Sequence, residues 1–293
     1  MLRVSTCNMD EVTVEDLPFI YKNINFPDGT QKIDFLEPLV ITPGNCYIIT
    51  WVGYEGDEEL ARLIFITKHL KDKFNAKVYL NMPYIPNARM DRTKSDSEVF
   101  TLKYFADVIN WLGFEKVFVF DPHSNVSEAL IDHIVVISPE DIIKEVIERA
   151  GTKFVYFPDE GAFKRYSGME CFKGLDPLIG HKKRDWKTGE IIGLNITSPE
   201  GYEFEDGHFM GCRILMVDDI ISLGGTLAYS ADVLYRLGFR EITAYASHVE
   251  NSILNEEKGK LLDRLKKGIV KKVYTTDSLF TKESNYIDVI KNF

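Results

Sequence analysis

Short apolar runs alternate with amphipathic stretches along most of this chain. Compact apolar runs predict buried strands, whereas apolar residues that recur every three or four positions predict helices. A further helix is predicted to begin at Ser138 and Pro139, because serine caps helices and proline suits the first helical position. We predict strands at 46–52, 76–83, 116–121, 134–137, 153–157, 213–217, 241–247 and 270–275, and helices at 57–74, 99–112 and 224–237.

This alternation of strands and helices predicts βαβ units and therefore mainly parallel sheets. More than one such series fits into 293 residues, and neither a low-complexity segment nor a long linker interrupts them. We therefore expect an α/β protein of two domains, 1–140 and 141–293, each with a mainly parallel sheet flanked by helices.

The composition of the chain limits the classes of ligand that it can be expected to bind. Hydrophobic residues make up 45% of the chain and charged residues 27%, which is ordinary for a globular protein. The formal net charge of −10 argues against general binding to nucleic acids or membrane surfaces, because both require a basic surface. A small anionic substrate stays open, since a local basic cluster or a metal ion can offset its charge.

The cysteines Cys7, Cys46, Cys171 and Cys212 form no CxxC pair, and none lies near a histidine at metal-ligand spacing. We interpret them as reduced thiols of a cytoplasmic protein. The first ten residues contain no apolar stretch typical of a secretion signal, and no run approaches 18 apolar residues. A cytoplasmic location is therefore expected.

The segment 217–226 (VDDIISLGGT) carries the most chemical information. Acids at the carboxyl end of a parallel strand face the crevice where open α/β sheets bind ligands, so Asp218 and Asp219 can accept hydrogen bonds from ribose hydroxyls. Gly224 and Gly225 let the backbone approach an anion, and the helix that starts near Thr226 presents free N–H groups to a phosphate. The alternative is an ordinary strand-to-helix turn with solvated acids.

This segment resembles the phosphoribosyl pyrophosphate (PRPP) loop of type I phosphoribosyltransferases and PRPP synthetases. Six further segments resemble those of the synthetases and follow in the same order: 26–29 (FPDG), 83–92 (PYIPNARMDR), 120–124 (FDPHS), 158–161 (PDEG), 180–184 (GHKKR) and 246–248 (ASH). The resemblance implies two type I phosphoribosyltransferase-like domains. It also implies transfer of a pyrophosphoryl group from ATP to the C1 hydroxyl of ribose 5-phosphate, with release of AMP.

The resemblance also implies a role for individual residues. The ribose phosphate would be bound by Asp218, Asp219, Ser222, Leu223, Gly224, Gly225 and Thr226. ATP, the co-substrate, would be bound by Phe26, Asp28, Arg89, Met90, Arg92 and His123. Mg²⁺, which bridges phosphates, would be held by His123 and Asp159. Lys182 and Arg184 would be catalytic, because their charges can neutralise the group in transit.

Without the resemblance, several of these residues have simpler interpretations. Arg89 and Arg92 are typical of surface ion pairs with nearby aspartates, and His123 of a structural histidine. Residues 181–184 are typical of a solvated basic run in a hairpin that turns at 187–189. The last interpretation is weakened because this run is the densest positive cluster in an acidic chain.

Leu223 departs from the family pattern, which usually has threonine there. The change removes a hydroxyl donor and adds bulk beside the expected 5-phosphate. A phosphodiester carries less charge than a terminal phosphate and needs fewer donors, so Leu223 suggests ADP-ribose as acceptor, giving ADP-ribose 1-pyrophosphate for NAD salvage. Thr30 and Met90 replace the usual Glu and Gln, which leaves base recognition and the nucleotide donor open, and Ala162 in place of a second Gly is a milder change.

Two other classes remain as alternatives: a phosphoribosyltransferase that consumes PRPP, and a non-catalytic regulatory relative. The basic segments 89–92 and 182–184 argue against the first. The retained acids, His123 and Lys182 argue against the second. The family commonly builds active sites between subunits, so the resemblance also implies a homo-oligomer.

Overall fold

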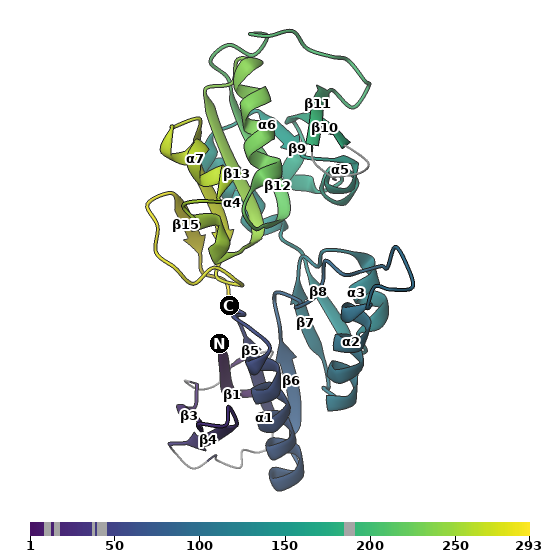
Figure 1. The fold of residues 1–293 in the computed structure, drawn as a ribbon, viewed down its shortest axis with the longest axis vertical. Coiled ribbons are helices and arrows are strands. Elements are labelled where there is room, and N and C mark those ends of the chain that lie inside the picture. The colour runs from purple at the N-terminus through teal and green to yellow at the C-terminus, as the bar shows by residue number, and fades with distance from the viewer. Residues whose placement is uncertain (9–12, 15–17, 37–38, 40–45, 185–190) are drawn as a thin grey trace. The chain divides into compact units, whose positions relative to one another are not determined.

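The structure is a computed structural model that describes residues 1–8, 13–14, 18–36, 39, 46–184 and 191–293. It divides into two compact units, Met1–Ile137 with Phe293, and Ser138–Asn292. Each unit has a largely parallel sheet flanked by helices (Figure 1), which confirms the predicted fold class. None of the described helices combines the length and apolarity needed to cross a membrane. The predicted hairpin turn at 187–189 lies outside the described residues.

The described strands of the first unit form a sheet in the order β2-β1-β5-β6-β7-β8 and a separate hairpin, β3-β4. Their bounds are β1 (Leu2–Asn8), β2 (Thr13–Val14), β3 (Tyr21–Asn25), β4 (Gln31–Phe35), β5 (Cys46–Trp51), β6 (Lys77–Asn81), β7 (Val117–Phe120) and β8 (Ile134–Ile137). The strands from β5 to β8 are parallel, whereas β1 pairs antiparallel with both β5 and β2. The strands β1 to β4 were not predicted from the sequence.

The helices of the first unit are α1 (Glu58–Phe74), α2 (Thr101–Leu112) and the short α3 (Asn125–Leu130). Of the residues whose spacing predicted α1, Leu63 and Leu70 are buried in one core with Val78 and Leu80 of β6, whereas Leu60 and Ile64 are only partly buried. Asn75 and Gly113 end the two helices in the left-handed conformation, which is a common helix terminus.

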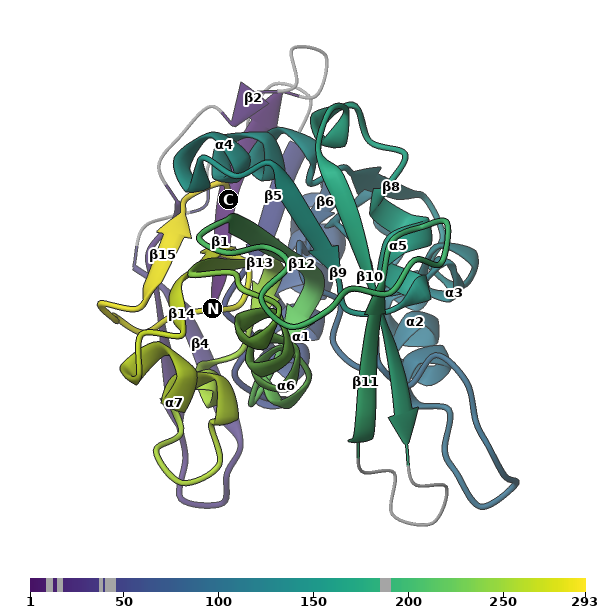
Figure 2. The same ribbon diagram turned by 90° about the horizontal axis from the view of Figure 1, so that it is seen from above.

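The second unit contains a sheet whose described strands follow the order β11-β10-β9-β12-β13-β14-β15. Their bounds are β9 (Phe154–Phe157), β10 (Asp176–Arg184), β11 (Ile191–Thr197), β12 (Arg213–Ile221), β13 (Glu241–Val249), β14 (Val270–Thr276) and β15 (Ile287–Ile290). All neighbours pair in parallel except β10 and β11, which form an antiparallel hairpin. Figure 2 shows this hairpin extending past the end of β9.

The helices of the second unit are α4 (Glu140–Ala150), α5 (Glu160–Tyr166), α6 (Gly225–Arg236) and α7 (Lys260–Lys266), with 3₁₀ turns η1 (Glu170–Phe172) and η2 (Asn251–Leu254). Helix α4 starts one residue later than predicted. Pro139 occupies the cap position, and the Ser138 hydroxyl accepts a hydrogen bond from the Glu140 amide at 3.2 Å.

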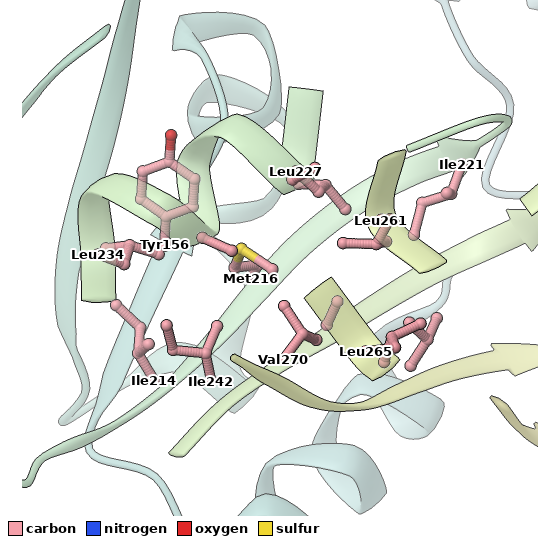
Figure 3. Packing of buried hydrophobic residues seen from close by; sticks show 14 of the residues in the cluster. Tyr156, Ile214, Met216, Ile221, Leu227, Leu234, Ile242, Leu261, Leu265 and Val270 are labelled. Atoms are coloured by element: carbon pink, nitrogen blue, oxygen red, sulfur yellow. The ribbon is translucent and has the colours of Figure 1, made fainter. Parts of the chain in front are cut away.

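Two helices cover one face of this second sheet. Leu227 and Leu234 of α6 and Leu261 and Leu265 of α7 pack in one core cluster with strand residues such as Met216 (Figure 3). Side chains alternate between the two faces of a strand. Accordingly, Tyr156 of β9 joins this cluster, whereas its neighbour Phe157 contacts the ring of Phe163 in α5 at 5.7 Å between centroids.

Candidate active site

Asp218 and Asp219 lie within β12, near its carboxyl end. The predicted strand stops at Val217, but the observed one continues to Ile221, because its last residues still pair with β13. The prediction was wrong because two acids interrupt the apolar run although the backbone ladder does not break. The carboxyl groups of the two residues interact with each other, and Asp159 lies close to both.

Asp219 faces α5. Its side chain is almost fully buried, and its Oδ2 lies 3.2 Å from Nη1 of Arg165. A buried carboxylate costs free energy unless a positive group or hydrogen-bond donors compensate it. Arg165 therefore compensates part of the cost of burying the Asp219 carboxyl group.

Asp218 is partly buried, and its Oδ1 accepts a hydrogen bond from the Asp219 amide at 3.0 Å. Burial raises the pKa of Asp218 well above its usual range, and the carboxyl groups of Asp219 and Asp159 raise it further. A carboxylate with a raised pKa is a stronger proton acceptor than an ordinary one. Asp218 is thus suited to a close hydrogen bond with a hydroxyl group.

The turn after β12 depends on Gly224. This residue has φ +71°, and a Cβ atom there would lie 2.4 Å from the Cβ of Leu261 in α7. Glycine is therefore required for both the backbone conformation and the packing of α7. A Cβ at Gly225 would meet only the Lys260 side chain, at 3.8 Å. The backbone at position 225 is therefore accessible where α6 begins. Because the first amides of a helix lack intrahelical acceptors, they are available there to a ligand.

The same turn is attached to η2 and α7. The Ser222 hydroxyl lies 3.2 Å from the hydroxyl of Ser252, which donates to Glu250 at 2.9 Å. The carbonyl of Leu223, a half-buried residue, accepts a hydrogen bond from the Leu261 amide at 3.5 Å. Ser222, Leu223 and Thr226 are all partly accessible.

Asp159 and Lys182 form an ion pair beside these acids. Oδ1 of Asp159 caps α5 by accepting a hydrogen bond from the Ala162 amide at 3.0 Å, and Oδ2 lies 3.0 Å from Nζ of Lys182. Burial opposes ionisation of Asp159, but Lys182 and the Ala162 amide outweigh it and hold its pKa below the usual value. Only 11% of the Lys182 side chain is exposed, so its ammonium group is held in a defined place.

Tyr156 of β9 contacts residues of α6 and β10 beside these acids. Its fully buried hydroxyl lies 2.9 Å from that of Ser230, which donates to the Thr226 carbonyl at 3.0 Å. Burial raises the pKa of Tyr156, so the hydroxyl keeps its proton. A Cβ atom at Gly180 would lie 2.2 Å from this hydroxyl. The tyrosine thus fits only because residue 180 on β10 has no side chain.

Arg184 is the last residue of β10, next to a bulge in its pairing with β11. Its side chain and that of Lys183 lie outside the described part of the structure. The catalytic role expected for Arg184 therefore stays a prediction.

In the first unit, Arg89, Met90 and Arg92 lie in the segment that follows β6. Buried Ile85 and Ala88 anchor this segment, whereas Arg89 is exposed and Met90 half-buried. The side chain of Arg92 is 83% exposed, and its Nε lies 3.6 Å from the Asp91 carboxylate. The observed contact of Arg92 is thus the surface ion pair of the simpler interpretation. An ion pair this exposed contributes little to stability.

His123 lies at the same edge of the first sheet. It follows β7, which is parallel to β6, and the Phe120 amide donates to the Pro83 carbonyl at 3.0 Å. His123 is half-buried, and nearby Asp121 is 4% exposed with φ +42°. A non-glycine residue with positive φ is uncommon and is often found at functional sites.

Phe26 and Asp28 lie in the turn of the β3–β4 hairpin. Asp28 accepts hydrogen bonds from the hydroxyl and amide of Thr30, at 2.7 and 2.9 Å, and these lower its pKa. The Phe26 side chain is 47% exposed. The hairpin lies beside β1 and α1, whereas β7 is toward the opposite edge of the sheet (Figure 1). The expected ATP residues of this unit therefore fall in two separate places.

Among the described residues, no group of three His, Cys, Asp or Glu side chains could hold a metal ion by itself. The predicted metal residues His123 and Asp159 belong to different units. Mg²⁺ usually binds proteins through one or two carboxylates together with waters and substrate phosphates, so it does not require such a cluster. The half-exposed carboxylate of Asp159 suits this mode of binding.

Comparison with known proteins places the chain in a family. No family model matches the chain. The ribose-phosphate pyrophosphokinase of Thermococcus kodakarensis is 30% identical over 232 residues, which are 76% of this chain and 75% of that protein. The chain belongs to the ribose-phosphate pyrophosphokinase family. The resemblance identified in the sequence is thereby confirmed.

Other family members cover more of the chain. The ribose-phosphate pyrophosphokinase of Sulfolobus acidocaldarius is 28% identical over 260 residues, 87% of this chain and 82% of that protein. The crystal structure of phosphoribosylpyrophosphate synthetase from Mycobacterium smegmatis matches with a TM-score of 0.70 at 18% identity, covering 96% of this chain and 87% of that one. The structural match extends the family likeness in fold across both units.

Sequence reasoning missed several residues of this pyrophosphokinase-family site. Arg165 lies on a helix too short for a clear apolar period, and Tyr156 is one of several aromatics in a buried strand. For Gly180, the sequence indicated only that it is the first residue of the basic segment 180–184. The positive φ of Asp121 has no sequence signal beyond its position after an apolar strand.

Proposed function

We propose that this chain transfers a pyrophosphoryl group from ATP to the C1 hydroxyl of a ribose phosphate and releases AMP. The observation that carries the proposal is the arrangement of the second unit. Asp218 and Asp219 lie on β12, the Gly224–Gly225 turn opens α6, and the Lys182–Asp159 pair lies beside them. The names of the curated relatives support the same reaction, with ribose 5-phosphate as the acceptor expected for the family.

In this proposal, the second unit binds the ribose phosphate. The carboxyl groups of Asp218 and Asp219 accept hydrogen bonds from ribose hydroxyls. The 5-phosphate binds to the turn from Ser222 to Thr226, where free amides and the positive end of α6 stabilise an anion. Because Arg165 and the bonds to α7 already hold these groups, little ordering is left to occur on binding.

Lys182 acts on the transferring group. Nucleophilic attack by the C1 hydroxyl on the β-phosphorus builds negative charge on the phosphoryl oxygens, and a positioned ammonium group stabilises that charge. Lys182 is held by Asp159 before substrate binds, and Arg184 adds a second cation from the same strand. Asp218 is suited to receive the hydrogen bond of the sugar because its pKa is raised.

The first unit supplies the contacts to ATP in this proposal. Arg89 and Arg92 bind the base and the phosphates, since a guanidinium group stacks on rings and pairs with phosphate oxygens. Phe26, Asp28 and Met90 would complete the nucleotide site in a homo-oligomer. Mg²⁺ would bind the phosphates of ATP and neutralise their charge, and Asp159 in the second unit and His123 in the first are the candidate protein ligands.

The test is release of AMP from ATP and Mg²⁺, with ribose 5-phosphate or ADP-ribose as acceptor at equal concentration. Asp218→Asn, which keeps the shape of the side chain but not its charge, is the matched control. Acceptor-dependent AMP that this variant loses would support the proposal. Absence of AMP with both acceptors would refute it.

ADP-ribose is the second candidate acceptor, and Leu223 is the observation that favours it. This leucine is half-buried in the phosphate turn, at a position where the family usually offers a hydroxyl. The diphosphate of ADP-ribose presents fewer charged oxygens near C5 than ribose 5-phosphate does, so it loses less when that donor is absent. Leu223→Thr should then raise the use of ribose 5-phosphate relative to ADP-ribose. An unchanged ratio of kcat/KM values would contradict the role given to Leu223.

A further inference from the structure

Two of the cysteines lie side by side in the first unit. Cys7 is in β1 and Cys46 is the first residue of β5, and the antiparallel register Thr6↔Tyr47 places them opposite each other. Their sulfur atoms are 2.7 Å apart. Both side chains are buried, at 4% and 8% exposure, and pack with Ile48 and Tyr79.

This arrangement is close to that of a disulfide. A disulfide bond is about 2.05 Å long and joins residues whose Cα atoms are about 4.4–6.8 Å apart. Directly opposite residues of antiparallel strands have Cα atoms about 4.5–5.5 Å apart. The sulfurs therefore need to approach by only about 0.7 Å, and no rearrangement of the strands is required.

We propose that Cys7 and Cys46 are a redox modification site, at which a small disulfide oxidant such as oxidised glutathione joins the two thiols across β1 and β5. One cysteine thiolate attacks the oxidant and forms a mixed disulfide, releasing one glutathione thiolate. The second cysteine thiolate then attacks the first cysteine's sulfur and releases the other glutathione. Two thiols are oxidised, one glutathione disulfide is reduced to two thiols, and the two cysteine protons go to the released thiolates.

The remaining cysteines offer a contrast in the other unit. Cys171 and Cys212 are partly exposed. Burial, together with the Glu140 carboxylate, raises the pKa of Cys171 to about 11, which disfavours its reactive thiolate. Exposure alone would favour oxidation of Cys171 and Cys212. Selective oxidation of Cys7 and Cys46 is instead expected because their sulfur atoms already lie close together.

A disulfide here would close the segment 8–45, which carries the β3–β4 hairpin. The closed segment already contacts both strands that the bond would join: Tyr21 of the hairpin donates to the Leu2 carbonyl at 3.1 Å, and the ring of Phe19, which precedes the hairpin, lies 6.3 Å from that of Tyr47. Restricting a loop of this length in the unfolded chain stabilises the folded state. The reduced thiols expected from the sequence would be the resting state, and the disulfide a reversible one. This inference does not depend on the proposed catalytic activity.

Peptide mapping of the wild-type protein tests the proposal directly. The protein is equilibrated with oxidised glutathione, alkylated and digested with trypsin without reduction. Trypsin places Cys7 in peptide 4–22 and Cys46 in peptide 33–62, and the other cysteines in peptides 166–173 and 188–213. We expect the first two peptides to be linked and to separate on reduction. Separate glutathione adducts, unmodified thiols or links to the other peptides would overturn the proposal.

Thermal unfolding provides the second measurement. Oxidation should raise the melting temperature of the first unit by about 5–10 °C, and dithiothreitol should reverse the shift. Cys46→Ser should abolish the shift, whereas the matched Cys171→Ser/Cys212→Ser double variant should retain it. A shift that survives Cys46→Ser would assign the stabilisation to another site. The mapping experiment needs no variant, so poor folding of Cys46→Ser would leave the test intact.

Discussion

In the second unit, the candidate residues hold one another in place: Arg165 binds Asp219, Asp159 binds Lys182, and Gly224 packs under α7. In the first unit, Arg92 is 83% exposed, and the buried residues Ile85 and Ala88 anchor the segment that carries it. The comparison teaches that the side proposed to bind the ribose phosphate is held together by its own contacts, whereas the side proposed to bind the nucleotide presents cations on a surface. Changes to the residues that hold the second-unit site in place should therefore affect stability as well as activity, and changes to the exposed cations of the first unit only substrate binding.

The largest expected effect is that of Lys182→Met. Removing a positioned charge from a developing oxyanion lowers kcat by about 10²–10³-fold. The measurement is the rate of AMP formation at saturating substrate. Lys182→Arg keeps the charge and is the matched control, with an intermediate rate. A kcat of Lys182→Met close to that of wild type would show that Lys182 is not at the reacting group.

Next is Gly224→Ala, which introduces both an unfavourable φ and a clash with Leu261. We expect the free energy of unfolding of the second unit to fall by about 2–4 kcal/mol. Gly225→Ala, whose added Cβ meets only Lys260 at 3.8 Å, should lose activity with a much smaller loss of stability. Urea denaturation of both variants measures the difference. Equal losses of stability would remove the special role given to position 224.

A smaller effect is expected for Arg92→Ala in the first unit. Loss of one exposed cation should raise the KM for ATP by about tenfold, because a hydrogen bond to a charged group contributes about 1.5 kcal/mol or more. The unfolding free energy should change by less than about 0.5 kcal/mol, as for most surface substitutions. Steady-state kinetics with ATP varied, together with a melting curve, tests both. A large loss of stability would contradict the contrast between the units.

The smallest expected effect is a gain in stability from Asp218→Asn. The pKa of Asp218 is raised in the folded protein, so its protonated form favours folding below the unfolded-state pKa, and that contribution is lost as pH rises through the folded pKa. The variant should therefore be more stable than wild type by about 1 kcal/mol near pH 7.5, with the difference vanishing near pH 4. Denaturation at the two pH values is the measurement. A variant less stable at the higher pH would reverse the sign assigned to Asp218.

The sequence was sufficient to predict the strands and helices with strong apolar patterns, such as β12 and α6. It was not sufficient for β10, whose apolar run is short and whose end is basic, or for β1 to β4, where polar residues interrupt the pattern. The expected end of β12 at Val217 was too early because pairing with β13 is a tertiary effect that residue types do not encode.

The candidate site shows the same limit. The acids and glycines of 217–226 could be found because strand, acids and turn are adjacent in the chain. The Arg165–Asp219 and Lys182–Asp159 pairs join residues 54 and 23 positions apart, so only the fold reveals them. The buried cysteine pair is a third case, because its 39-residue separation hides a direct contact.

The fit of Tyr156 against Gly180 has a consequence for how this site can evolve. The tyrosine hydroxyl occupies the space that any side chain at position 180 would need, and it is also the partner of Ser230 in α6. A mutation at position 180 alone would expel the hydroxyl, and loss of the hydroxyl alone would leave a gap beside Ser230. Positions 156 and 180 should therefore vary together among relatives, with tyrosine accompanying glycine and a smaller or hydroxyl-free residue accompanying any larger side chain on β10.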